Sequence, residues 1–213
     1  MQQSKRTFGI SLGFHLAFLL WTMVVCTLDV QQIGPEGSMV GLASLNAFIH
    51  SLTGVNFALY IITDWLGLVP LVICMGFGLL GLSQWIRRKH LLKVDRSILV
   101  LGGFYVIVAA VFLLFESVVV NYRPVLINGV LEASYPSSTT ILVMCVMPTA
   151  MMQLRERIRR KDLRMLVITV MTAFMVFMFI ARLISGVHWF SDIVGGALLS
   201  AGLVTLYDAV VNT

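Results

Sequence analysis

The chain alternates long apolar runs with short polar segments. Six of these runs are long enough, or nearly so, to cross about 30 Å of hydrocarbon as helices of roughly 20 residues. They are Phe8–Leu28, Trp65–Trp85, Ser97–Phe115, Ser138–Leu154, Met165–Ile184 and Ile193–Val211. Because the runs are continuous and do not alternate at every second residue, they indicate helices and not the strands of a barrel. We therefore predict an all-α, polytopic membrane protein with six transmembrane helices.

Two further segments bear on this topology. Val40–Ile62 is apolar, but polar residues and a glycine interrupt it, so an interfacial or re-entrant helix fits better than a seventh span. The first run follows Lys5 and Arg6 and has no small-residue cleavage site behind it, so we expect a retained anchor. No linker or repeat divides the chain, and we expect residues 1–213 to form a single membrane domain.

The composition agrees with a bilayer as the surrounding solvent. The 213 residues are 59% hydrophobic and 12% charged, which is too few charges for a soluble domain of this length. The three cysteines, Cys26, Cys74 and Cys145, all lie in apolar runs, which argues against a disulfide framework. No cluster of histidines or carboxylates suggests a metal site.

The net charge of +5 follows from the positions of the basic residues. All but two of the 15 basic residues lie before the first run, after the second or after the fourth. Six alternating helices place these segments on one side, which the positive-inside rule makes cytoplasmic together with both termini. This pattern explains the charge without a nucleic-acid partner. The exceptions, Arg123 and Arg182, share the opposite side, which favours a common anion over two snorkelling side chains.

Candidate catalytic residues lie beside the second of these arginines. In "ARLISGVHWFSD", His188 follows Arg182 by six residues and Asp192 follows His188 by four. On one helix face, Asp192 would accept the Nδ1–H of the imidazole and leave Nε2 as a nucleophile. Taken alone, the group is explained equally well by an interfacial histidine next to Trp189 and an acid at a helix N-terminus.

Together, three blocks of residues resemble the type-2 phosphatidic acid phosphatase superfamily. Its signature reads Lys-x6-Arg-Pro, Pro-Ser-Gly-His and Ser-Arg-x5-His-x3-Asp, and "YRP", "PSST" and "ARLISGVHWFSD" follow in that order within about residues 116–192. The resemblance implies a membrane lipid phosphatase without metal or cofactor, in which His188 forms a phosphohistidine and Asp192 orients its ring. The phosphate-binding residues that it implies are Arg123, Arg182, Ser137 and Ser138.

Three positions depart from the family pattern. Glu116 stands in place of the lysine, Thr139 in place of the histidine of the second block, and Ala181 in place of the serine before Arg182. That histidine is the family's acid or base for the leaving group, and loss of a general acid typically costs about 100- to 10,000-fold in rate. The carboxylate of Glu116 should weaken anion binding further.

The missing acid bears on the choice of substrate. An alkoxide that leaves from a phosphate monoester needs a proton, whereas a lipid phosphate that leaves from a diphosphate has a second pKa of about 6 and needs it much less. A catalytically active protein should therefore prefer lipid diphosphates to simple monoesters.

Three functions remain to be weighed. The first is a lipid phosphatase of the cell membrane with extracytoplasmic active-site loops, for which the resemblance implies undecaprenyl diphosphate, phosphatidylglycerol phosphate or a diacylglycerol (pyro)phosphate as substrates. The second is a weak or inactive relative that binds phospholipid headgroups, which Thr139 and Glu116 favour. The third, a transporter or channel, is disfavoured because few ionisable residues lie inside the runs. The sequence makes no prediction of oligomeric state.

Overall fold

The computed structural model of the protein describes residues 2–213 and is built almost entirely of helices. In chain order, the helices are α1 (Gln2–Thr27), α2 (Ala43–Thr53), α3 (Phe57–Leu66), α4 (Leu68–Arg88), α5 (Arg96–Ser117), α6 (Ser138–Arg157), α7 (Lys161–Ile184) and α8 (Phe190–Val211). The two-residue strands β1 (Gln31–Gln32) and β2 (Met39–Val40) pair antiparallel, and η1 (Pro35–Gly37) and η2 (Leu91–Lys93) are 3-10 turns. The predicted all-α fold is confirmed.

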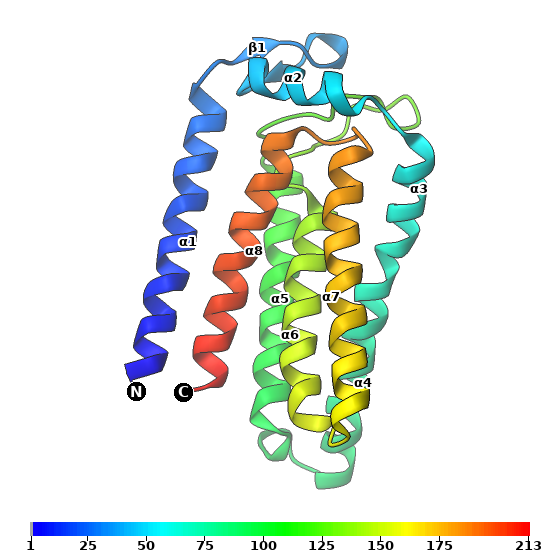
Figure 1. Cartoon of the computed structure of the whole chain (residues 1–213). Coiled ribbons are helices and arrows are strands. Elements are labelled where there is room, and N and C mark those ends of the chain that lie inside the picture. Colours follow the sequence, from blue (N-terminus) through cyan, green and yellow to red (C-terminus); the bar gives the residue numbers. More distant parts are fainter. Residues whose placement is uncertain (1) are drawn as a thin grey trace.

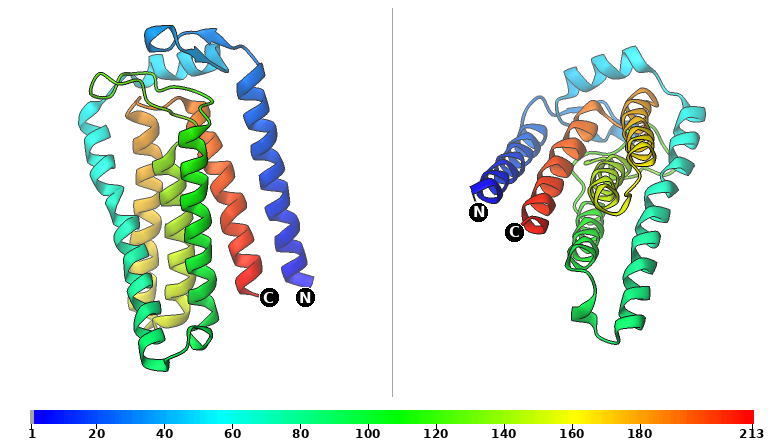
Figure 2. Two further views of the ribbon diagram at one scale, coloured as in Figure 1. Left: turned by 180° about the vertical axis from the view of Figure 1, so that it is seen from behind. Right: turned by 60° about the horizontal axis from the view of Figure 1, so that its bottom comes forward.

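The long helices run side by side with both termini at one end of the bundle (Figure 1, Figure 2). Within residues 2–213, five stretches are long and apolar enough to cross a membrane. They are Gln3–Thr27, Phe57–Arg88, Arg96–Ser117, Lys161–Ile184 and Phe190–Val211. Helix α6 is less apolar and buries Thr140, Thr149 and Gln153 among its neighbours. The protein is thus a multi-pass membrane protein, whereas a sixth span and cytoplasmic termini stay predictions.

The segment expected to be interfacial divides into two helices. Helix α2 lies across the end of the bundle that is remote from the termini (Figure 1), and it exposes the apolar side chains of Phe48 and Leu52. An apolar face exposed at the end of the bundle is what the expected interfacial helix would present to a membrane. Helix α3 instead turns along the bundle and leads through Gly67 into α4, so this apolar stretch begins at Phe57 and not at Trp65.

The connection between α7 and α8 is fixed against the turn between α2 and α3. The amide of Asn56 donates to the carbonyl of Ser185 at 2.9 Å. Gly186 has a φ of +65°, and a Cβ there would lie 1.8 Å from the carbonyl oxygen of Gly54, so only glycine fits at this close approach. The α7–α8 connection, which carries His188, is therefore held in one place.

Helix α8 is the most enclosed of the candidate spans. Of its most apolar window, 56% is buried, compared with 6% for Phe57–Arg88. A Cβ on Gly195 would lie 2.6 Å from the ring of Tyr135, so the absence of a side chain lets the α5–α6 loop pack directly on α8. This contact brings the loop next to the start of α8.

Candidate active site

His188 occupies the α7–α8 connection and is only 3% exposed. Its Nε2 lies 3.0 Å from Nη2 of Arg182. Because a guanidinium group can only donate, Nε2 is the acceptor and the proton of the neutral ring is on Nδ1. Burial, together with the positive charges of Arg123 and Arg182, holds the pKa of His188 well below its ordinary value. The imidazole is therefore neutral near pH 7, with a lone pair on Nε2.

The other ring nitrogen of His188 contacts Ser134 in the α5–α6 loop. Nδ1 lies 3.0 Å from Oγ of Ser134, and the same hydroxyl donates to Oδ2 of Asp192. The direct contact between His188 and Asp192 that the sequence suggested is thus replaced by a bridge. The reason is that α8 begins at Phe190, so His188 precedes the helix and does not share a helical face with Asp192.

Asp192 is fully buried and accepts hydrogen bonds on both carboxylate oxygens. Oδ2 accepts the backbone N–H of Trp189 at 2.9 Å, which caps the start of α8, in addition to the hydroxyl of Ser134. Oδ1 accepts from Asn121 at 3.2 Å and from Ser191 at 3.3 Å. Four donors around one carboxylate offset the cost of burying it.

The two arginines predicted to share an anion converge on one aromatic ring. The guanidinium carbons of Arg123 and Arg182 lie 6.0 and 5.3 Å from the ring centroid of Tyr60, on α3. The electron-rich ring face is favourable for cations at this distance. Nη1 of Arg182 also donates to the hydroxyl of Thr63 at 3.3 Å. Helix α3 thus positions both arginines beside His188.

Several N–H groups of these arginines are buried but not hydrogen-bonded. Within residues 2–213, this holds for Nε of Arg182 and for Nε and Nη1 of Arg123. Oε2 of Glu132 lies 3.0 Å from Nε of Arg123, an ion pair without hydrogen-bond geometry. Buried donors are normally satisfied, so free guanidinium donors on two adjacent arginines fit the oxygens of a phosphate group.

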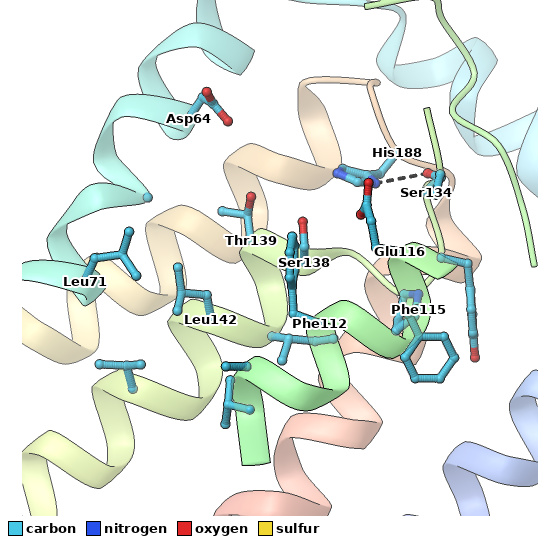
Figure 3. A pocket seen from close by; sticks show the side chains of 18 of the residues that line it. Asp64, Leu71, Phe112, Phe115, Glu116, Ser134, Ser138, Thr139, Leu142 and His188 are labelled. Carbon is cyan, nitrogen blue, oxygen red and sulfur yellow. Dashed lines mark hydrogen bonds between the residues drawn. The ribbon is translucent and has the colours of Figure 1, made fainter. Parts of the chain in front are cut away.

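A cavity of about 590 Å³ opens beside His188, between α4, α5 and α6 (Figure 3). Its polar end is lined by Asp64, Glu116, Ser134, Ser138, Thr139 and His188. The rest of its wall is mostly apolar and includes Leu71, Phe112 and Leu142. An apolar cavity with convergent polar groups at one end fits an amphiphilic ligand.

The residues of the second block have separate positions. Ser138 and Thr139 line the cavity at the start of α6, where the first backbone N–H groups have no acceptor within the helix. Ser137 is engaged within the protein, because its N–H donates to the carbonyl of Asp192 at 3.1 Å and its hydroxyl accepts from Thr140 at 3.0 Å. Of the two serines in this block, Ser138 is therefore the one that lines the cavity.

The remaining departures from the family pattern also have defined places. Glu116 lies in the last turn of α5 and lines the polar end of the cavity, where Asp64 of α3 adds a second carboxylate (Figure 3). Ala181 is buried in α7 and contributes no polar group to the site. The cavity is thus acidic where the family pattern has a lysine.

Sequence reasoning missed three residues of the site, namely Ser134, Asn121 and Tyr60. The first two could have been found from their positions in the sequence. Asn121 lies two residues before the motif that begins at Arg123, and Ser134 lies two residues before the motif that begins at Pro136. Tyr60 carried none, because an aromatic residue near a membrane interface is ordinary.

Comparisons with known proteins agree with this architecture. Residues 117–213 match the model of the PAP2 superfamily. The fold is similar, with a TM-score of 0.63 at 17% identity, to the first transmembrane PAP2 type phosphatidylglycerolphosphate phosphatase from Bacillus subtilis, over 95% of this chain and 96% of that chain. Curated proteins gave no significant match. The last 97 residues of the chain, 117–213, therefore resemble the PAP2 superfamily, and the chain as a whole has the fold of a transmembrane PAP2-type protein.

Proposed function

We propose that the protein is a membrane lipid phosphatase that moves a phosphoryl group from a lipid diphosphate to His188 and then to water. The observation that carries this proposal is a neutral His188 that lines the polar end of an apolar cavity and whose Nε2 is hydrogen-bonded to Arg182 behind it. The lipid chain would lie against α4, α5 and α6, with its phosphates next to His188.

Two steps complete the reaction. In the first, the lone pair of Nε2 forms a bond to phosphorus while the bond from phosphorus to the bridging oxygen breaks, and the lipid phosphate leaves with the electron pair. In the second, a water oxygen attacks phosphorus, the bond to Nε2 breaks, and the released phosphate or the solvent takes the water proton.

The arginines stabilise the transferring group in both steps. Nη2 of Arg182 donates a hydrogen bond to Nε2 of His188. The guanidinium must therefore move to a phosphoryl oxygen before phosphorus can approach Nε2. Arg123 has free donors for a second oxygen. Fixed positive charges around the three equatorial oxygens are the main source of catalysis in phosphoryl transfer.

Thr139 supports a diphosphate as the substrate. Its hydroxyl lines the cavity at the position of the family's acid, but an alcohol is far too weak an acid to protonate a leaving group near pH 7. A departing lipid phosphate, with a second pKa of about 6, leaves without that proton.

The distribution of basic residues supports an extracytoplasmic site. The α4–α5 and α6–α7 connections, which are rich in arginine and lysine, lie at the same end of the bundle as both termini (Figure 1). The loop before α6 and the α7–α8 connection lie at the other end. Under the positive-inside rule, His188 then faces the outer leaflet.

A second candidate function is headgroup binding without turnover. The observation that favours it is that Thr139 and Glu116 both line the polar end of the cavity, where the family pattern has a histidine and a lysine. Arg123 and Arg182 would hold the phosphate in this case too, but the leaving group would have no donor.

Phosphate release by the purified protein from a polyprenyl diphosphate, phosphatidylglycerol phosphate and a phosphatidate tests these functions. His188→Ala and the control His90→Gln, an exposed residue at the opposite end of the bundle, are assayed alongside. If the protein is a phosphatase, it releases phosphate fastest from the diphosphate. The His90→Gln variant then keeps this activity and the His188→Ala variant loses it. Binding without release from any lipid supports the second candidate, and equal turnover of monoester and diphosphate refutes the diphosphate preference.

A further inference from the structure

We propose that the hydroxyl of Ser134 is a positioning group that couples the Asp192 carboxylate to the His188 ring. Its effect on rate rests on the function proposed above, whereas its effect on the histidine ring does not. The hydroxyl lies between the two side chains, 3.0 Å from Nδ1 of His188 and in a hydrogen bond to Oδ2 of Asp192.

The donor and the acceptor of each hydrogen bond in the series Arg182–His188–Ser134–Asp192 follow from the two end groups. At one end, the guanidinium of Arg182 can only donate, so Nε2 of His188 accepts and Nδ1 carries the ring proton. At the other end, the ionised carboxylate of Asp192 can only accept, so the hydroxyl of Ser134 donates to it. The hydroxyl oxygen of Ser134 then accepts the proton of Nδ1, so every hydrogen bond in the series has one donor and one acceptor.

Among residues 2–213, Ser134 is the one donor to Asp192 that also contacts the His188 ring. The other donors to the carboxylate, from Asn121, Trp189 and Ser191, hold Asp192 in place without a hydrogen bond to His188. The hydrogen-bonded connection from Asp192 to the imidazole therefore runs through a single hydroxyl. When Nε2 bonds to phosphorus, the ring becomes cationic, and this link stabilises the positive charge.

The backbone of Ser134 is held independently of its hydroxyl. Its N–H donates to the carbonyl of Asn121 at 2.9 Å. The next residue, Tyr135, packs on Gly195 and its hydroxyl lies 2.7 Å from that of Thr22 on α1. Replacement of Ser134 by alanine should thus remove the bridge and leave the loop in position.

Nitrogen NMR of the full-length protein in detergent micelles, labelled with ¹⁵N-histidine, tests the coupling directly. The sequence has four histidines, and the signal lost in His188→Asn identifies the ring of interest. We expect the wild-type ring to be protonated on Nδ1, with that proton protected from solvent exchange. In Ser134→Ala, exchange of this proton should be at least about 10-fold faster, since the hydroxyl that accepts it is gone and only the backbone of Ser134 is left beside the ring.

Ser191→Ala is the matched control, because it removes a donor from Oδ1 of Asp192 and leaves Ser134 in place. It should keep the protected Nδ1 proton, as should Ser134→Thr, which retains a hydroxyl. The proposal is overturned if the wild-type proton is on Nε2, if Ser134→Ala leaves its exchange unchanged, or if Ser191→Ala changes it equally. These outcomes do not depend on turnover, so they stand even if the protein is no phosphatase.

The rate of phosphohistidine formation with a polyprenyl diphosphate gives the second readout. Loss of one hydrogen bond that acts on a charged ring should lower this rate by about 10- to 100-fold in Ser134→Ala. In Ser134→Thr, the rate of phosphohistidine formation should be within about threefold of the wild-type rate. In Ser191→Ala, this rate should fall less than in Ser134→Ala. An equal loss in Ser134→Ala and Ser134→Thr would overturn the role of the hydroxyl.

Discussion

The two sides of the candidate site differ in how firmly their polar groups are held. On the nucleophile side, named for the role proposed for His188, the residues Ser134, His188 and Asp192 are each at most 3% exposed and are linked by hydrogen bonds. On the leaving-group side, Thr139 is half-buried and Glu116 is exposed in the cavity. A change in the buried network leaves a polar group unsatisfied, whereas a change at the cavity wall does not. The departures from the family pattern at the cavity are therefore compatible with an intact nucleophile.

The largest effect is expected from loss of the nucleophile. His188→Ala should lower phosphate release from a lipid diphosphate by at least about 1,000-fold, because no phosphohistidine can form. Quench-flow trapping of the labelled phosphoenzyme measures this loss, with His90→Gln as the control. Phosphate release that persists in His188→Ala would mean that the nucleophile side does not carry the chemistry.

The arginines should come next in magnitude. Arg182→Lys keeps a positive charge but loses the fork that reaches both Nε2 and phosphoryl oxygens, so kcat/KM should fall by about 100-fold. Arg123→Lys should have a smaller effect, since Arg123 makes no hydrogen bond to His188 in the structure. Arg159→Lys, in the exposed α6–α7 connection, serves as the control. If all three variants behave alike, the arginines do not share an anion.

A change on the leaving-group side should raise activity. Thr139→His supplies a group that titrates near neutral pH at the start of α6, so release from a phosphatidate should increase by about 10- to 100-fold. Release from a diphosphate should increase much less, because its leaving group needs no proton. The ratio of the two rates, measured in the same micelles, tests the comparison of the two sides. An equal gain on both lipids would show that proton donation is not the missing element.

The smallest effect concerns the pH dependence of stability. The pKa of His188 in the native protein lies well below its value of about 6.5 in an unfolded chain. When the pH falls below about 6.5, the unfolded chain therefore binds a proton at this residue, whereas the native protein does not. Stability should then decrease toward acidic pH by up to ~1.4 kcal/mol per pH unit from this group. Melting temperatures between pH 7.5 and about 5 should fall more steeply for the wild type than for His188→Gln. Parallel curves would contradict a buried, neutral ring.

Much of the fold and part of the site could be predicted from the sequence. Apolar runs of about 20 residues can only be helices in a bilayer, since every backbone group must be satisfied within the segment. Arg123 and Arg182 are separate from the other basic residues in the sequence. Together with His188 and Asp192, they predicted the end of the bundle at which the candidate site lies. Thr139 and Glu116 were also visible as departures from a known pattern.

Only the tertiary structure decided how these residues meet. The i, i+4 spacing suggested a direct contact between His188 and Asp192, but α8 begins two residues after His188, and Ser134, 54 residues away, lies between them. Likewise, Tyr60 lies beneath both arginines although it is 122 residues from Arg182. Sequence patterns report local periodicity, whereas contacts between distant segments depend on where each helix begins and which close approaches its glycines permit.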